Sequence, residues 1–325
     1  MKPLLDIIIV NWNSGRQLRD CLESIAGTDR TGFQLQRVVV VDNGSTDGSI
    51  DGLDTIGSCS TVIRNQRDLG YGAAANQGAR GSGVDYLLFL NPDTRLYPDS
   101  LVKPLRFMEQ RENARIAICG VQLLDRHGQV ARHCTRFPRP SHFFSKMVGF
   151  DKIFPRHVDD LFMSEWDHKE SREVDHVMGA FWLMRQSVFD ELGGFDENFF
   201  LYLEDVDFSF RAKQAGWRSY YFAEAHIHHN AGSTTEGYKA ESLFYRLQSR
   251  ILYGYKHFNL WSATGLMLGT LLLEPLSRLA FGIVHRSKHE IAYTLKGYLM
   301  LWRSLIPIIR VASYVGRNGN ERTAS

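Results

Sequence analysis

The stretch that decides the fold is Val-Val-Val-Val-Asp-Asn-Gly-Ser-Thr-Asp-Gly-Ser, residues 38–49. Four consecutive β-branched residues form an unbroken apolar run, which is typical of a strand in a parallel sheet with both faces covered by helices. The strand ends at Asp42, and turn-forming residues follow it. Because ligands of open parallel sheets bind beyond the carboxyl ends of the strands, the stretch predicts an α/β fold with a binding loop at this point.

The same alternation of strands and helices extends through the first two-thirds of the chain. Apolar runs predict strands at 7–10, 61–63, 86–90, 116–119 and 180–184, and helical patterns predict helices at 17–25 and 204–214. The segment 132–173 has no clean period and holds three of the nine prolines, so we expect a loop-rich excursion there. Together these elements predict a mostly parallel central sheet with helices on both faces.

The composition changes near residue 241. Residues 241–325 contain 11 Lys and Arg and four Glu but no Asp. We therefore expect an α/β domain over 1–240 and a basic helical appendage over 241–325. Four cations recur every seven residues and would share one helix face, with Pro307 kinking or breaking the helix; they are Lys296, Arg303, Arg310 and Arg317. Such a helix fits an anionic membrane surface, and the solvated face of an ordinary packed helix is the alternative.

One stretch of the appendage is strongly apolar. Residues 258–273 carry no charge over 16 residues, but Glu274 and Pro275 follow directly. Because a spanning helix needs about 20 apolar residues, we expect this stretch not to cross a membrane.

Composition also bounds the class and location of the protein. With 44% hydrophobic and 23% charged residues, the chain is globular rather than disordered or fibrous. Its four cysteines form no C-x-x-C pair, which argues against a disulfide framework and a zinc site and fits a reducing compartment. Asp6 interrupts the first apolar stretch, so we expect no export signal. The expected location is the cytoplasm, peripheral on the inner face of the cell membrane, with no nucleic-acid partner.

Polar residues follow three of the expected strands, at 11–13, 42–49 and 91–94. Turn chemistry explains any one of these segments, but three at one sheet edge indicate a shared binding site. The sequence has neither a dinucleotide-binding G-x-G-x-x-G after a strand nor a phosphate-binding lysine loop, so the two commonest nucleotide sites are not indicated.

Over residues 5–235 the chain resembles the family 2 glycosyltransferases of the GT-A fold, and within them the rhamnosyltransferase-like branch. The motifs that carry the resemblance are 41–49, 65–72 with Asn76, Asn91-Pro92-Asp93-Thr94, 179–184, 194–197, Glu204-Asp205-Val206-Asp207 through Arg211, and His228-His229 before Gly232-Ser233. The resemblance implies an inverting transfer of a sugar from a nucleotide diphosphate donor, with a divalent cation, Mg²⁺ or Mn²⁺, on the diphosphate.

The resemblance also implies roles on the donor side. Asp93 is expected to bind the cation, although Asn91 stands where the family has a second aspartate, and His228 is expected to complete the shell, with His229 as the fallback. Asp42 matches the aspartate that accepts from the N3–H of uracil or thymine. The remaining expected donor contacts are Asn11, Asn13, Asn65, Gly70 and Asn91.

On the acceptor side, Asp205 matches the family's general base, which takes the proton of the attacking hydroxyl. Glu204 beside it is expected to bind the acceptor and, as a like charge, to raise the pKa of Asp205. A plain acidic first turn of a helix is the alternative for the pair. Trp182 is expected to line the acceptor pocket, with ordinary core as its alternative. Arg250 and Lys256 are expected to bind a lipid-linked diphosphate.

The expected reaction is transfer of L-rhamnose from dTDP-L-rhamnose to a lipid-linked saccharide acceptor in cell-surface polysaccharide synthesis. Three alternatives stay open: a UDP-hexose donor, a nucleotidyltransferase, and a non-catalytic module that binds sugar nucleotides. A nucleotidyltransferase needs a basic residue in the first phosphate loop, and residues 11–15 contain none. A pure binding module has no need of a base, which argues against that alternative.

Overall fold

The computed structural model describes residues 1–53, 56, 61–149, 161–230 and 236–322, with the backbone alone at 236 and 316–322. The chain forms two compact units: the first comprises 1–137, 162–197 and 204–234, and the second comprises 138–161, 198–203 and 235–325. The second unit therefore takes in two segments that lie before the boundary expected at residue 240.

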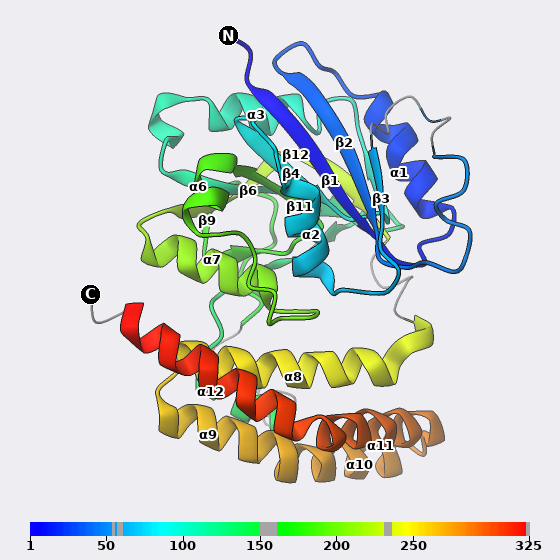
Figure 1. The fold of residues 1–325 in the computed structure, drawn as a ribbon, viewed down its shortest axis with the longest axis vertical. Coiled ribbons are helices and arrows are strands. Elements are labelled where there is room, and N and C mark those ends of the chain that lie inside the picture. The colour runs from blue at the N-terminus through cyan, green and yellow to red at the C-terminus, as the bar shows by residue number, and fades with distance from the viewer. Residues whose placement is uncertain (54–55, 57–60, 150–160, 231–235, 323–325) are drawn as a thin grey trace. The chain divides into compact units, whose positions relative to one another are not determined.

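The first unit is built on one large sheet (Figure 1). Its described strands are β1 (Leu4–Asn11), β2 (Gln34–Asp42), β3 (Thr61–Arg64), β4 (Tyr86–Leu90), β5 (Thr94–Leu96), β6 (Ile116–Leu124), β7 (Val130–Ala131), β9 (Arg172–Val174), β11 (Phe181–Arg185) and β12 (Arg218–His229). Their order is β3-β2-β1-β4-β11-β6-β12-β5, with β7 on β6 and β9 on β12. Strands β8 (Cys134–Thr135) and β10 (His176–Val177) form a separate antiparallel pair.

Strand direction decides where the polar loops meet. Strands β1, β2, β3 and β4 are mutually parallel, and β11 is antiparallel to both β4 and β6. Since β12 is parallel to β6, these two strands run in the same direction as β1. The carboxyl ends of six strands therefore lie along one edge of the sheet, and the expectation of a mostly parallel sheet is confirmed.

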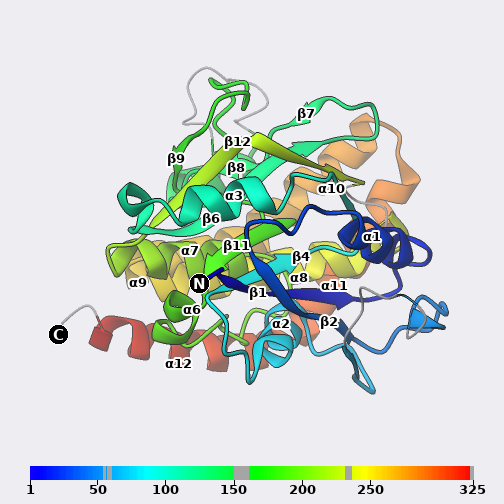
Figure 2. The same cartoon turned by 90° about the horizontal axis from the view of Figure 1, so that it is seen from above.

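Alternation along the strands gives each face its own core. Leu5, Ile7 and Ile9 of β1 pack into one apolar cluster with α1 (Gln17–Ala26) and α3 (Val102–Met108). Ile8 packs into the opposite cluster, where α2 (Tyr71–Ala79), α6 (Gln186–Glu191) and α7 (Glu204–Gln214) cover the sheet. Figure 2 shows α1 and α3 on one side of the sheet and α2 and α6 on the other. A short 3-10 turn, η2 (Arg111–Asn113), follows α3.

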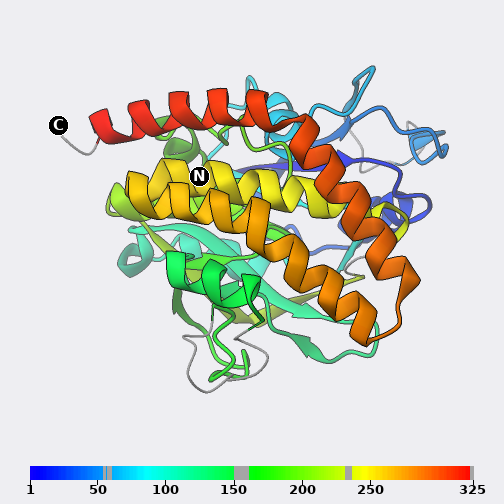
Figure 3. The same cartoon turned by 90° about the horizontal axis from the view of Figure 1, so that it is seen from below.

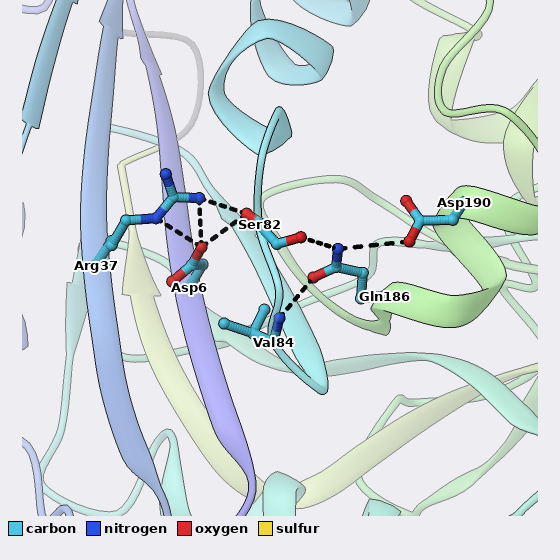
Figure 4. Close-up of polar contacts among 6 residues, drawn as sticks. All are labelled: Asp6, Arg37, Ser82, Val84, Gln186 and Asp190. Carbon is cyan, nitrogen blue, oxygen red and sulfur yellow. Dashed lines mark hydrogen bonds and ion pairs between the residues drawn. The ribbon is translucent and has the colours of Figure 1, made fainter.

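A buried polar network lies at the opposite edge, near the start of β1 (Figure 4). The Arg37 guanidinium donates to the buried carboxylate of Asp6 at 2.6 and 2.9 Å, and the Ser82 hydroxyl donates to the same oxygen at 2.7 Å. Gln186 of α6 continues the network by donating to the Ser82 carbonyl and accepting from the Val84 N–H. A buried charge needs partners, and this network supplies them to one oxygen of Asp6 at the edge away from the polar loops.

The second unit is helical. Its described helices are α4 (Pro140–Met147), the 3-10 turn η4 (Glu236–Tyr238), α8 (Lys239–His257), α9 (Leu260–Leu268), the π-helical turn η5 (Gly269–Leu273), α10 (Glu274–Val284), α11 (Lys288–Arg303) and α12 (Leu305–Arg322). Leu247 and Ile251 of α8 form its core with Tyr298 and Leu301 of α11 and Ile308 of α12. The expected helical appendage is present.

The apolar stretch continues farther than expected. Helix α9, η5 and α10 form one helical run, Leu260–Val284, which passes through Glu274 and Pro275 (Figure 3). Two factors explain this: Pro275 sits in the first turn of α10, where a missing N–H costs little, and the buried Glu274 is paired with Arg250 and Arg278. In the part of the chain that the structure describes, this run alone is long and apolar enough to cross a membrane, judged by length and composition.

The expectation of one basic helix face across the last four cations was wrong. Helix α11 ends at Arg303, Ser304 is its C-cap, and the chain turns there into α12 (Figure 3). Lys296 therefore lies on α11, where it pairs with Glu241 at 2.6 Å, while Arg310 lies on α12. Pro307 falls in the first turn of α12, which tolerates proline and favours a helix start.

Candidate active site

The loops after β1 and β2 form one polar structure. Asn11 and Asp42 are paired residues at the ends of these strands. The Asn11 side-chain amide donates to the Asp42 carboxylate at 2.8 Å and to the Ser45 hydroxyl at 3.0 Å. Asn13 joins the loops again, because its side-chain oxygen accepts from the Thr46 N–H at 2.8 Å. The two segments are therefore held in a fixed relation.

Asp42 is buried among the residues of these loops. Asn11 is 0% and Asp42 is 2% exposed. The Asp42 carboxylate accepts from the Asn11 amide and from both the N–H and the hydroxyl of Ser45. These contacts hold Asp42 in the loop structure, and its expected contact with the base stays a prediction.

The loop before α2 is joined to the same structure. The Asn65 amide donates to Asn43 and to Gln77 at 2.9 Å, and Asn43 donates to the Gly70 carbonyl at 3.2 Å. Gly44 has a φ of +76°, and a Cβ there would lie 3.0 Å from the backbone of Arg67. Glycine is thus required where the two loops touch. The expected donor contacts Asn65 and Gly70 lie at the same sheet edge as Asn13.

Asp93 and His229 form a pair at the end of β12. The side chains are each 9% exposed, and His229 Nε2 lies 3.3 Å from Asp93 Oδ1. That oxygen is buried and has no hydrogen-bond partner among the described residues. A carboxylate oxygen and an imidazole nitrogen that lie side by side can both act as ligands of a divalent cation such as Mn²⁺. Asp93 and His229 therefore fit the expected cation.

The position of His229 corrects the expectation for His228. In the antiparallel pairing of β12 with β5, His229 lies opposite Thr94 and His228 lies opposite Arg95. Because successive side chains of a strand point to opposite faces, only one of the two histidines can face Asp93, and it is His229. The Gly232-Ser233 part of this motif lies outside the described residues. Within the described residues, no group of three His, Cys, Asp or Glu side chains could hold a metal alone.

Asp205 lies at the same edge, at the start of α7. Its carboxylate accepts from the Gly179 N–H at 3.2 Å and from the Val206 N–H at 2.8 Å, and His176 Nε2 lies 3.2 Å from it. The Ala180 carbonyl in turn accepts from the Asn91 N–H at 3.0 Å, which joins this region to the end of β4. The structure thus brings the expected base to the edge that carries Asp93.

The environment shifts the pKa values of the two adjacent carboxyl groups in opposite directions. Burial and the nearby Asp205 raise the pKa of Glu204 well above its usual range. Burial also acts to raise the pKa of Asp205, but His176 and two backbone N–H groups outweigh it and lower that pKa. The expectation that Glu204 raises the pKa of Asp205 was therefore wrong: the pKa of Asp205 is lowered, and it is the pKa of Glu204 that is raised. Burial and both carboxylates raise the pKa of Tyr71 on α2.

Two of the expected acceptor residues are structural. Trp182 is 1% exposed, its indole N–H donates to the Val177 carbonyl at 2.9 Å, and both faces of β11 are covered, so it belongs to the core. Arg250 is 8% exposed and is ion-paired with Glu274, so it does not present a free cation. Lys256 is half-buried, with its ammonium 5.5 Å from the ring centre of Phe199, and its role stays a prediction.

Sequence reasoning missed His176 and Tyr71. His176 follows a segment with no clean periodicity and stands three residues before Gly179, and no spacing rule marks it. Tyr71 falls within the motif 65–72, where no spacing rule marks it either. Their proximity to Asp205 depends on the pairing of β10 with β8 and on the packing of α2, which are long-range contacts.

The fold and this arrangement define the class of protein. The structure is similar to that of the mannosyltransferase PcManGT from Pyrobaculum calidifontis in complex with GDP-Man and Mn²⁺, with a TM-score of 0.54 and 15% identity over 97% of this chain and 87% of that one. The fold is therefore of the GT-A type, as expected.

The particular family follows from the sequence comparisons. Residues 6–193 match the model of glycosyl transferase family 2, and the chain belongs to this family. It is 27% identical to the N-acetylglucosaminyl-diphospho-decaprenol L-rhamnosyltransferase of Mycobacterium tuberculosis, over 81% of this chain and 88% of the relative. It is 30% identical to the rhamnosyltransferase WbbL of Escherichia coli (strain K12), over 54% of this chain and 63% of the relative.

Proposed function

We propose that this glycosyltransferase moves L-rhamnose from dTDP-L-rhamnose to a lipid-linked saccharide in the synthesis of a cell-surface polysaccharide. The observation that carries the proposal is the ionised Asp205 carboxylate at the same sheet edge as the Asp93 and His229 pair. The mycobacterial relative, matched over most of its length, is named for rhamnosyl transfer to a saccharide on a diphospho-decaprenol. That name supports both the sugar and the class of acceptor.

The chemistry assigned to the chain is a single displacement with inversion. The acceptor hydroxyl attacks the sugar's C1, its proton passes to the Asp205 carboxylate, and the C1–O electron pair leaves with the nucleoside diphosphate. Asp205 suits this role because it is ionised and held by backbone N–H groups. No covalent sugar–enzyme bond is needed, so one carboxylate suffices.

Asp93 and His229 would hold the divalent cation. The charge of a departing diphosphate is stabilised by a bound Mg²⁺ or Mn²⁺ when that cation is present. Two protein ligands leave room for phosphate oxygens and water, which is how such cations are usually bound in nucleotide sites. The open Oδ1 of Asp93 is the feature that supports this assignment.

The test is a donor panel with the purified full chain. Release of nucleoside diphosphate is measured with dTDP-L-rhamnose, UDP-glucose, UDP-N-acetylglucosamine and GDP-mannose, each with and without an N-acetylglucosaminyl-diphospho-polyprenol acceptor. We expect dTDP release that requires the acceptor, and a product whose anomeric configuration is inverted by NMR. If the acceptor stimulates release of UDP but not of dTDP, the donor is a UDP-hexose and not dTDP-L-rhamnose.

We further propose that the second unit rests on an anionic membrane surface, on the cytoplasmic face. Many large apolar side chains of the run Leu260–Val284 are exposed, among them Leu260, Trp261, Leu272, Leu276, Ile283 and Val284. Trp261, at 87% exposed, is the extreme case. Each such side chain that leaves water contributes about 1.5–3 kcal/mol, so an apolar surface of this extent favours lipid.

Charge supports a bilayer as the partner. Between residues 257 and 315 the sequence has six Lys and Arg but only two acids, Glu274 and Glu290. Glu274 is buried in an ion pair, which leaves exposed cations such as Arg286, Lys288 and Arg303 beside the apolar surface. The buried Glu274 and its partner Arg278 lie within the apolar run, which favours a helix lying in the interface over one that spans it.

A further inference from the structure

A second buried side chain is aimed at the base. His176 on β10 is 3% exposed, and β10 pairs with β8 so that His176 lies opposite Thr135. The Thr135 hydroxyl is 2.9 Å from His176 Nδ1, and His176 Nε2 is 3.2 Å from Asp205 Oδ2. Side chains from β8, β10 and α7 thus form a continuous row that ends at the carboxylate.

The partners determine how the ring is protonated. A neutral imidazole carries a proton on one nitrogen and a lone pair on the other. An ionised carboxylate can only accept, so the nitrogen that faces Asp205 must be the donor. Nδ1 is then the acceptor, and the Thr135 hydroxyl is a group that can donate to it. Thr135 then satisfies Nδ1, while Nε2 lies 3.2 Å from Asp205 Oδ2 and makes no aligned hydrogen bond among the described residues.

We propose that His176, oriented by Thr135, is a positioning residue for the base and fixes the Asp205 carboxylate toward the acceptor hydroxyl. This inference rests on the proposed role of Asp205. The Gly179 and Val206 N–H groups hold the carboxylate from the backbone, and His176 adds the side-chain contact that steers Oδ2. A carboxylate held from three sides keeps one orientation, which proton transfer in a displacement requires.

The same contact sets the proton affinity of the base. The titratable groups that interact with Asp205 are His176 from β10, Glu204 on its own helix and Tyr71 on α2. The pKa of Glu204 is raised, and Asp207 acts on Glu204 and is paired with Arg211 at 2.8 Å. His176 is therefore the side chain that lowers the pKa of Asp205, and its loss raises that pKa. Activity that needs the ionised form then starts at a higher pH.

The test compares two pairs of variants of the full chain. His176→Phe removes both nitrogens at similar volume, and His176→Gln keeps a donor; Thr135→Val removes the hydroxyl, and Thr135→Ser keeps it. We measure kcat, the donor KM and the pH dependence of kcat/KM on a short-chain diphospho-saccharide acceptor. Thermal unfolding shows whether each variant is folded.

We expect His176→Phe to lower kcat by about tenfold or more with little change in donor KM, and to move the acidic limb of the profile to higher pH. Thr135→Val should do the same to a smaller extent, while Thr135→Ser stays near the native protein and His176→Gln falls between. An unmoved acidic limb in folded His176→Phe would overturn the proposal. If that variant does not fold, identical profiles for Thr135→Val and Thr135→Ser would overturn it instead.

The role of Asp205 is tested separately by Asp205→Asn. If Asp205→Asn is inactive while the His176 and Thr135 variants keep the native kcat and pH profile, this inference fails and the proposed function stands. An active Asp205→Asn would remove the base itself.

Discussion

At the scale of single residues, environment rather than residue type decides which carboxylate acts. Glu204 and Asp205 are neighbours on the first turn of α7, yet the pKa of Glu204 is raised and that of Asp205 is lowered. Glu204 Oε2 is buried without a hydrogen-bond partner among the described residues, whereas Asp205 is held by two backbone N–H groups and lies close to an imidazole. Burial without partners favours the neutral acid, and donors favour the charged one.

The two adjacent histidines give a matched pair of variants for the cation site. His229→Ala should weaken Mn²⁺-dependent donor binding, because His229 Nε2 is the nitrogen beside Asp93. Loss of an outer-shell partner costs about 10- to 100-fold in metal affinity, and loss of a ligand should cost at least as much. His228→Ala, one residue away on the opposite face of β12, should leave that binding unchanged. Calorimetric titration of the donor with Mn²⁺ and with chelator measures both, and equal losses would refute the assignment to His229.

At the scale of elements, sequence periodicity predicted the strands and helices whose ends depend on local contacts. The apolar runs placed β4 and the helix 204–214 within a residue of their ends, because periodicity reports burial directly. Periodicity did not distinguish the faces of β11, a strand covered on both sides, so Trp182 was misplaced. A break near Pro307 was predicted, and the structure places it at Ser304. The passage of the helix through Glu274 escaped prediction, because the buried carboxylate is paired with Arg250, 24 residues away in sequence.

Close packing of α2 on the sheet gives an element-scale prediction. A Cβ at Gly78 would lie 2.6 Å from Ile8 Cγ2 and 3.0 Å from Val41 Cγ2. Gly78→Ala should therefore destabilise the protein by about 1–3 kcal/mol through overpacking. Gly83→Ala, where nothing lies within 4 Å of the added Cβ, should change the free energy of unfolding by less than about 0.5 kcal/mol. Urea unfolding measures both, and equal stability of the two variants would mean that α2 is not packed so closely.

At the scale of the whole molecule, the residues proposed for catalysis and those proposed for membrane binding belong to different units. The residues proposed for chemistry all lie in the first unit, whereas the basic composition and the exposed apolar run belong to the second. A lipid-linked acceptor is held at a membrane, so a surface with affinity for lipid would raise its encounter rate with the enzyme.

Membrane association is tested by charge reversal. Arg286→Glu with Lys288→Glu should lower binding to phosphatidylglycerol-containing vesicles by about tenfold or more, since each cation near an anionic surface contributes about 1 kcal/mol. Added salt should shrink the difference, because screening acts over about 8–10 Å. Arg111→Glu with Arg126→Glu, exposed in the first unit, makes the same change in net charge and should not affect binding. Equal co-sedimentation of the two double variants would contradict the proposed surface.

The measurement that tests the central claim most directly compares Asp205→Asn with Glu204→Gln in the transfer assay. Asn cannot take the acceptor's proton, so Asp205→Asn should lower kcat by about 10²–10⁴-fold while donor affinity persists. Gln resembles the neutral acid that Glu204 already is, so Glu204→Gln should lose less than about tenfold. Near-native turnover by Asp205→Asn, or a larger loss in Glu204→Gln than in Asp205→Asn, would show that Asp205 is not the base.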